Sequence, residues 1–250
     1  MQHPPDPQVE GQPRPAEARR RFALLRELIY NPRWRHRLLL VGGLLALLAV
    51  AALTLLASFY AVFPLDVAFT QELQEEQWAL VAQLMYIVSL VGYVPWSWVA
   101  VAAATLLVGA LLGWRDGLYL LLITVAQGLI NGLIKRAIGR PRPIDTLVEV
   151  FVPEHGFSFP SGHVMFYTVF FGFLLFLVLT RMPAGPWRWV AGLPLAALVL
   201  LVGPSRIILG AHWLSDVLAA YLLSLVILVA AIEGYIHLLT PRDPTPAPGP

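Results

Sequence analysis

Long apolar stretches alternate with short polar segments through most of the chain, from residue 38 to residue 238. The first of them, residues 38–63, contains no charged side chain. At a rise of about 1.5 Å per residue it can reach ~39 Å as a helix, more than the roughly 30 Å hydrocarbon core of a bilayer. Five further stretches of the same kind follow, at residues 96–112, 118–134, 162–179, 189–202 and 211–238. The pattern predicts an all-α integral membrane protein, built as a six-helix bundle.

One apolar stretch, residues 78–94, does not fit a simple span. Gly92 interrupts it and Pro95 follows it, and both residue types are unfavourable in a helix interior. We therefore expect an additional helix that lies in the membrane interface or is only partly inserted. The segment before it contains Asp66 and several glutamates, and is expected to be an acidic connection.

The two ends of the chain differ from its apolar middle. Residues 1–15 contain five prolines and few apolar residues, a composition typical of disordered segments. Residues 16–30 place apolar side chains at helical spacing between arginines, which favours a basic amphipathic helix on an anionic leaflet over a plain juxtamembrane linker. We thus expect a basic cytoplasmic tail with a juxtamembrane helix (1–37), a transmembrane domain (38–238) and a proline-rich disordered tail (239–250).

Composition supports a membrane protein and excludes several other functions. Hydrophobic residues make up 58% of the chain and charged residues 13%, with a mean hydropathy of +0.71, whereas soluble domains carry about 25% charged residues. The net charge is only +2, and no basic run with interleaved aromatics occurs, so membrane lipids rather than nucleic acids are the expected partners. Because the chain has no cysteine, it forms no disulfide and has no thiolate nucleophile.

The segment between the third and fourth predicted spans gathers positive charge. Lys135, the only lysine of the protein, is followed within eight residues by Arg136, Arg140 and Arg142. Fixed cations of this kind, together with backbone N–H donors, are what the binding of a phosphate group requires. The segment is therefore a candidate anion site.

The same segment enters the fourth span through Pro160–His163, with the sequence Pro-Ser-Gly-His. Ser161 is expected to cap this helix, and Gly162 lets an anion approach the free N–H groups of its first turn. His163 places an imidazole at the same helix start. A capped helix with a bystander histidine is the structural alternative.

A second polar cluster lies one apolar segment further on and consists of Ser205, Arg206, His212 and Asp216. His212 and Asp216 are four residues apart, so on one helix they share a face. A carboxylate that accepts from one imidazole nitrogen fixes the tautomer and leaves the other nitrogen free as a nucleophile. A structural His–Asp pair that holds a helix end is the alternative. No predicted span has the histidine and carboxylate spacing of a metal site, so neither a metal nor another cofactor is expected.

The distribution of cations predicts the orientation in the membrane. With the N-terminus inside, twelve of the seventeen lysines and arginines fall on the cytoplasmic side. The positive-inside rule therefore favours cytoplasmic N- and C-termini, with both polar clusters facing the periplasm or exterior. Cations on that face require compensation by a bound anionic group, or by lipid headgroups in the case of Arg136 and Arg140.

The two clusters resemble the signature motifs of the type 2 phosphatidic acid phosphatase superfamily. The matching residues are Lys135 with Arg142-Pro143 for the first motif, Pro160–His163 for the second, and Ser205-Arg206 with His212 and Asp216 for the third. No position within these motifs departs from the family pattern, and together they cover residues 135–216. The resemblance implies a six-helix membrane phosphatase that acts on lipid phosphates without a metal.

The resemblance also implies a role for each matching residue. His212 would attack phosphorus and form a phosphohistidine, with Asp216 orienting the imidazole. His163 would protonate the leaving oxygen and then activate water. The remaining motif residues would hold the phosphate oxygens: Lys135, Arg142, Ser161, Gly162 and Arg206. A phosphoryl transition state needs positioning and fixed positive charge above all, which agrees with these roles.

The predicted function is dephosphorylation of a membrane lipid phosphate or diphosphate at the outer face of the cytoplasmic membrane. Undecaprenyl diphosphate, phosphatidylglycerol phosphate and phosphatidate are substrates of the expected type. One alternative is a lipid phosphotransferase that uses the same phosphohistidine. Another is a non-catalytic membrane protein that uses the cations only to bind an anion or a lipid.

Overall fold

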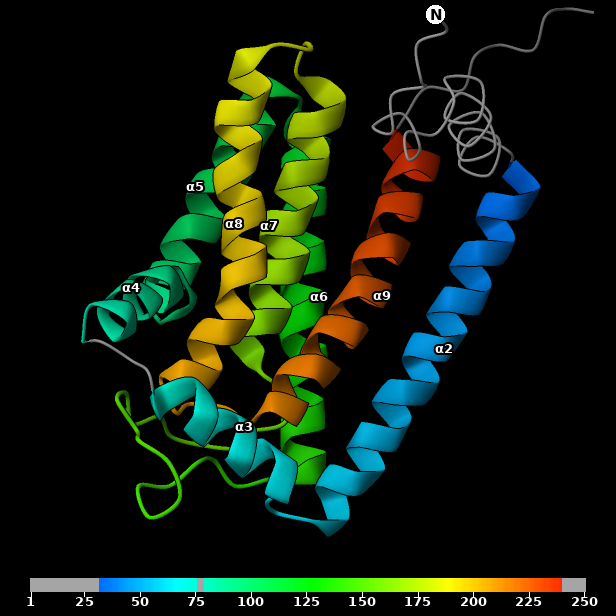
Figure 1. Ribbon diagram of the computed structural model, residues 1–250. Coiled ribbons are helices and arrows are strands. Elements are labelled where there is room, and N and C mark those ends of the chain that lie inside the picture. Colours follow the sequence, from blue (N-terminus) through cyan, green and yellow to red (C-terminus); the bar gives the residue numbers. More distant parts are fainter. Residues whose placement is uncertain (1–31, 76–78, 240–250) are drawn as a thin grey trace, which may run out of the picture. The chain divides into compact units, whose positions relative to one another are not determined.

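The computed structural model describes residues 32–75 and 79–239, which contain helices and connecting loops but no strand. The elements are α2 (Pro32–Phe59), α3 (Pro64–Glu75), α4 (Ala79–Ser89), η1 (Leu90–Gly92), α5 (Trp96–Leu111), α6 (Trp114–Ile138), α7 (Gly162–Arg181), α8 (Pro186–Ile208) and α9 (Leu214–Leu239) (Figure 1). The all-α prediction is confirmed. The predicted amphipathic helix at residues 16–30 and the C-terminal tail from residue 240 lie outside the described residues.

The chain divides into two compact units, Met1–Leu45 and Ala46–Pro250. In the first unit the described residues form the N-terminal part of α2, whose leucines are largely exposed, as lipid-facing side chains are. The second unit contains the rest of α2 and all the helices from α3 to α9. It therefore includes every residue of the two polar clusters.

The described helices include five candidate membrane crossings, or six if one bent pair of helices is counted as a crossing. Five of them, α2 from His36, α6, α7, α8 and α9, are each long and apolar enough to cross a bilayer. The helices α4 and α5 meet this criterion only together, and they are bent by 59° at the break between them. This agrees with the predicted bundle, in which α5 is a span and α4 is the additional, partly inserted helix. The outer face of α4 is apolar, with Leu80, Leu84 and Ile87 exposed at helical spacing.

The expected acidic connection at Asp66 is in fact a helix, α3. Proline is favoured in the first turn of a helix, where its missing N–H has no partner to lose, and Pro64 occupies this position. Asp66 and Thr70 lie one turn apart and are buried, so this polar helix has an inward face. It packs against α8 and α9 near the ends that face the 139–161 loop (Figure 1).

The last helix begins at Leu214 rather than at residue 211, so the prediction that His212 and Asp216 lie on one helix is wrong. The carboxylate of Asp216 accepts a hydrogen bond from the backbone N–H of Trp213 at 3.0 Å, which caps the first turn of α9. Gly210, at φ +65°, turns the chain between α8 and this cap. A Cβ added there would lie 2.1 Å from the carbonyl oxygen of Glu149, so only glycine fits. His212 therefore lies in the connection.

Helix α7 forms the centre of the second unit. It packs against α6, α8 and α9, and its Tyr167, Phe170 and Phe173 are almost completely buried. Close packing of side chains this large against neighbouring helices is what holds a helix in place inside a membrane. Because α7 is held on several sides, its N-terminus has a fixed position at the same end as the C-termini of α6 and α8 and the start of α9 (Figure 1).

Candidate active site

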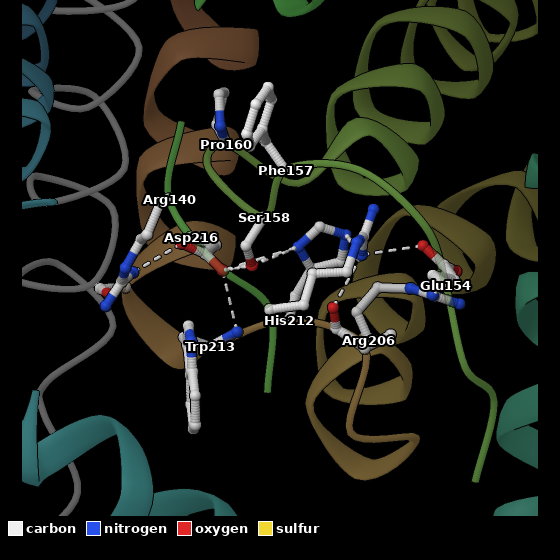
Figure 2. Close-up of polar contacts among 12 residues, drawn as sticks. Arg140, Glu154, Phe157, Ser158, Pro160, Arg206, His212, Trp213 and Asp216 are labelled. Carbon is white, nitrogen blue, oxygen red and sulfur yellow. Dashed lines mark hydrogen bonds and ion pairs between the residues drawn. The ribbon is translucent and has the colours of Figure 1, made fainter. Parts of the chain in front are cut away.

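Both polar clusters meet at this end of the second unit. Helix α6 ends with a normal C-cap at Gly139. This residue has a left-handed conformation (φ 68°), and its N–H donates to the carbonyl of Lys135. The chain then runs as a loop to Ser161, where α7 begins. The connection between α8 and α9 lies against this loop, since Phe151 N donates to the carbonyl of Leu209 at 3.2 Å. The loop, the connection and the adjoining ends of α8 and α9 supply the residues labelled in Figure 2.

The imidazole of His212 is buried, and its Nε2 lies 3.1 Å from Nη1 of Arg142. Because a guanidinium group can only donate hydrogen bonds, Nε2 must accept this one. The neutral ring then carries its proton on Nδ1. The nitrogen with the free lone pair therefore faces the cations of the site.

The other ring nitrogen of His212 faces a hydroxyl group and a carboxylate. Its Nδ1 lies 3.4 Å from Oγ of Ser158 and 3.6 Å from Oδ2 of Asp216 (Figure 2). The Ser158 hydroxyl donates to the same carboxylate oxygen. Ser158 thus bridges the imidazole and the carboxylate, which are at ion-pair rather than hydrogen-bond distance. Ser158 could not be found from the sequence, because a loop serine outside the motifs carries no pattern of its own.

Glu154 lies between the two arginines of the motifs. Its Oε2 is 2.9 Å from Nη1 of Arg142, and its Oε1 accepts from Nη2 of Arg206. Arg206 also donates to the hydroxyl of Tyr93 at 2.8 Å. A carboxylate held by two guanidinium groups occupies a position that suits an anion, so an anionic ligand would compete with Glu154 for the same donors.

His163 lies in the first turn of α7 with its ring edge against Tyr93, at 4.6 Å between the ring centroids. Behind it, η1 approaches so closely that a Cβ added at Gly92 would lie 2.1 Å from Cδ2 of His163. A chain of contacts through Tyr93, Arg206 and Glu154 joins this ring to Arg142 and so to His212. The structure therefore brings both histidines of the motifs into one site.

The remaining motif residues line the same region. Lys135 Nζ donates to the carbonyls of Phe157 and Ser158 at 2.6 and 3.2 Å, which ties the end of α6 to the loop. Gly162 packs against α6, and a Cβ added there would lie 3.1 Å from Oδ1 of Asn131. Ser205 shares a hydrogen bond of 2.6 Å with Ser89, so it links α8 to α4.

Three buried polar atoms of the motif residues have no hydrogen-bond partner: Oγ of Ser161, Nε2 of His163 and Nε of Arg206. Ser161 occupies the N-cap position of α7, but its side chain makes no capping bond, so the predicted capping contact is wrong. Each such atom costs about 1–3 kcal/mol when it is buried unpaired. A ligand with several acceptor atoms would satisfy the donors among them.

The environment of Arg140 differs from the one that the sequence suggested. It is only 1% exposed, and its guanidinium forms ion pairs with Asp66 at 2.8 Å and Asp216 at 2.6 Å. It therefore does not face lipid headgroups, and that alternative is wrong for this residue. Arg136, by contrast, is exposed.

The electrostatic environment keeps His212 neutral. Burial lowers the pKa of His212 well below its usual value of 6.5, and the nearby cations Lys135, Arg142 and Arg206 lower this pKa further. A group with a lowered pKa loses its proton at lower pH, so the free imidazole persists below pH 6.5. A neutral ring is the form that acts as a nucleophile.

Among residues 32–75 and 79–239, no three histidine, aspartate or glutamate side chains are grouped so that they could hold a metal ion. Besides Asp216, the charged groups that act on His212 are cations, contributed by α6, α8 and the loop between α6 and α7. Such an arrangement suits an anionic ligand.

Comparisons with known proteins identify relatives of the chain. Phosphatidylglycerophosphatase B of Bacillus subtilis is 32% identical over 121 residues, 48% of this chain and 58% of that protein. A lipid A 1-phosphatase of Rhizobium etli is 35% identical over 131 residues, 50% of this chain and 48% of that protein. The matched part thus spans about half the length of these curated relatives.

The fold and the motifs agree with this relationship. The chain resembles the crystal structure of a transmembrane PAP2-type phosphatidylglycerolphosphate phosphatase from Bacillus subtilis, with a TM-score of 0.69 and 23% identity over 80% of this chain and 98% of that one. Residues 116–236 match the PAP2 superfamily, and this segment contains all three motifs. The resemblance seen in the sequence is confirmed: the segment 116–236 belongs to the PAP2 superfamily.

Proposed function

We propose that the protein removes a phosphate group from a membrane lipid phosphate or diphosphate, through a phosphohistidine on His212 and without a metal. The observation that carries this proposal is the set of buried unpaired atoms on Ser161, His163 and Arg206. Other contacts join these residues to His212: His163 and Arg206 through Tyr93, Glu154 and Arg142, and Ser161 through its backbone N–H to the carbonyl of Asp216. A phosphate group has enough acceptor oxygens to satisfy the donors among the unpaired atoms. The relatives' names, which refer to phosphatidylglycerophosphate and lipid A, support a lipid phosphate as the substrate.

In the first step, the phosphate displaces Glu154 from its two arginines and is held by Lys135, Arg142 and Arg206. Nε2 of His212 attacks phosphorus, and the bond between phosphorus and the lipid oxygen breaks. The imidazolium formed keeps its proton on Nδ1, where Ser158 and Asp216 stabilise it. The leaving oxygen takes a proton from His163, which is the general acid of this step.

In the second step, water attacks the phosphorus of the phosphohistidine. His163, now neutral, accepts a proton from this water as a general base. The N–P bond breaks, which releases inorganic phosphate and restores the neutral imidazole of His212. The fixed cations supply the charge stabilisation that the reaction needs.

The motif residues supply the groups that would bind one phosphate group. Arg140 is not available for a second phosphate, because Asp66 and Asp216 already bind its guanidinium inside the protein. Undecaprenyl diphosphate, phosphatidylglycerol phosphate, phosphatidate and lipid A phosphates are therefore all candidates, and each presents one phosphate group to this site. Exposed apolar side chains around the second unit would receive the lipid tail.

The proposed orientation places this site on the outer face of the cytoplasmic membrane. The ends of α6, α7, α8 and α9 opposite to the site carry Arg115, Arg181 and Arg188, and the positive-inside rule favours the cytoplasm for that end. A substrate would then be a lipid of the outer leaflet.

We expect purified full-length protein in lipid nanodiscs to release inorganic phosphate from at least one of these lipids. The rate should be unchanged by EDTA and strongly lowered by vanadate, because vanadate mimics pentacoordinate phosphorus. Phosphate release that requires a metal and resists vanadate would contradict the mechanism. A labelled phosphoryl group found on a lipid alcohol would identify a phosphotransferase, and substrate left intact would support a non-catalytic anion-binding protein.

Replacing Gly92 by alanine should lower kcat by about 10- to 100-fold, because a displacement of a reacting group by ~1 Å can cost as much. The new methyl group would overlap the ring of His163, which is already confined by Tyr93. Phosphate-release kinetics measure the effect. Gly128→Ala is the matched control, since a Cβ at Gly128 meets no atom within 4 Å, and an equal loss in both variants would contradict the explanation.

A further inference from the structure

Arg140 is a buried cation enclosed by two carboxylates. Its Nη1 lies 2.6 Å from Oδ1 of Asp216 (Figure 2). Its Nη2 lies 2.8 Å from Oδ2 of Asp66. The same guanidinium donates to the carbonyl of Ala61 at 3.1 Å and to the hydroxyl of Ser215 at 2.7 Å. The exposed fraction of the Arg140 and Asp216 side chains is 0%, and that of Asp66 is 3%. The mechanism described above gives no role to Arg140 or to Asp66.

Asp66 joins α3 to the first turn of α9. Its Oδ1 accepts from the backbone N–H of Ser215 at 2.8 Å, and its Oδ2 accepts from the Ser215 hydroxyl at 2.6 Å. Together with the ion pair to Arg140, these bonds occupy both oxygens of the carboxylate. Helix α3 is thus attached directly beside Asp216, although it lies far away in the sequence.

Both oxygens of Asp216 are also occupied. Oδ1 receives Arg140, while Oδ2 receives the Ser158 hydroxyl and the N–H of Trp213. A carboxylate held by three donors cannot rotate without breaking bonds. Its edge towards Nδ1 of His212 is therefore fixed.

We propose that Arg140 and Asp66 are positioning residues, which hold Asp216 and, through it, the imidazole of His212 in the orientation for attack. This inference rests on the proposed phosphatase function. Arg140 alone would cancel the charge of Asp216. With Asp66 included, the three groups carry a net charge of −1, which remains available to stabilise the cationic imidazole of the phosphohistidine. The pair therefore fixes the direction of the carboxylate without removing its charge.

The Asp66→Asn variant tests this role, because it keeps the size of the side chain and removes its charge. We expect kcat to fall by about 10- to 100-fold while KM stays within about twofold, since the loss affects an interaction that strengthens during the reaction. Glu72→Gln is the matched control: it changes an exposed carboxylate of the same helix and should leave kcat unchanged.

Two further readouts separate positioning from a purely structural effect. In an Asp216→Asn background, Asp66→Asn should change kcat by less than about twofold, because residues that act through one another are not additive. The acid limb of the kcat/KM profile should also move to lower pH in Asp66→Asn. The titratable and charged groups around the ring, which stay in place, are Lys135 on α6, Arg142 in the loop, His163 on α7, Arg206 on α8 and Asp216 on α9. Removing the negative charge of Asp66 beside these groups lowers the pKa of His212.

Arg140→Lys provides an independent test if Asp66→Asn does not fold. A lysine keeps the charge but cannot bridge two carboxylates as a guanidinium does, so the same loss of kcat is expected. If the wild type is active and the Asp66→Asn or Arg140→Lys variant keeps its full activity, the positioning role is overturned and the proposed function is not affected. An additive loss in the Asp216→Asn background also overturns the positioning role. A wild type that releases no phosphate overturns the proposed function itself.

Discussion

Replacing His212 by alanine should lower kcat by on the order of 10⁴-fold or more. The substitution removes the atom that would form the bond to phosphorus, and no neighbouring group can replace it. The cations that would hold the phosphate remain, so KM should change much less than kcat. The rate of phosphate release from the preferred lipid measures this loss.

A labelling experiment shows whether His212 carries the phosphoryl group. Brief incubation of the wild type with a labelled lipid phosphate, followed by alkaline quenching, should leave an acid-labile label on the protein. The label should be absent from His212→Ala and present in His155→Ala, which changes an exposed histidine of the same loop. Activity of His212→Ala within about tenfold of the wild type would contradict a nucleophilic role, since a lost nucleophile costs far more.

The membrane architecture could be predicted from the sequence because lipid imposes a simple pattern. A crossing helix must be apolar over its whole length, and this requirement identifies segments such as 38–63 and 162–179 without any tertiary information. The motif residues could also be recognised, because their order and spacing are specific. The structure adds that the ends of α6, α7, α8 and α9 bring them together.

The supporting residues could not be predicted in the same way. Ser158 and Glu154 lie in an irregular loop, where no period indicates which way a side chain points. Asp66 precedes Asp216 by a long stretch of sequence, and only the packing of α3 against α9 brings the two carboxylates to one arginine. In the sequence, the polar residues of α3 look like those of a solvated connection, because nothing there shows that Arg140 is their buried partner.

Two local predictions failed at the starts of helices. Ser161 lies where a cap residue is expected, but its hydroxyl is left without any partner. Asp216 caps α9 through Trp213, which sets the start of that helix after His212. Both differences from the prediction involve residues of the proposed site, and functional sites are where predictions from local sequence are expected to fail most often.

Replacing Arg206 by alanine should lower kcat/KM by about 10²–10³-fold, as expected for the loss of a fixed donor to developing charge. Its guanidinium is held by Tyr93 and Glu154, and its buried Nε has no partner, so it is positioned before any substrate binds. Arg206→Lys should recover only part of the activity, because an ammonium group lacks the planar fork. Arg136→Gln, which changes an exposed arginine of the neighbouring segment, should retain nearly full activity. Equal losses in Arg206→Ala and Arg136→Gln would mean that the cations act only by attracting anions to the surface, and the fixed geometry of Arg206 would then have no part in the reaction.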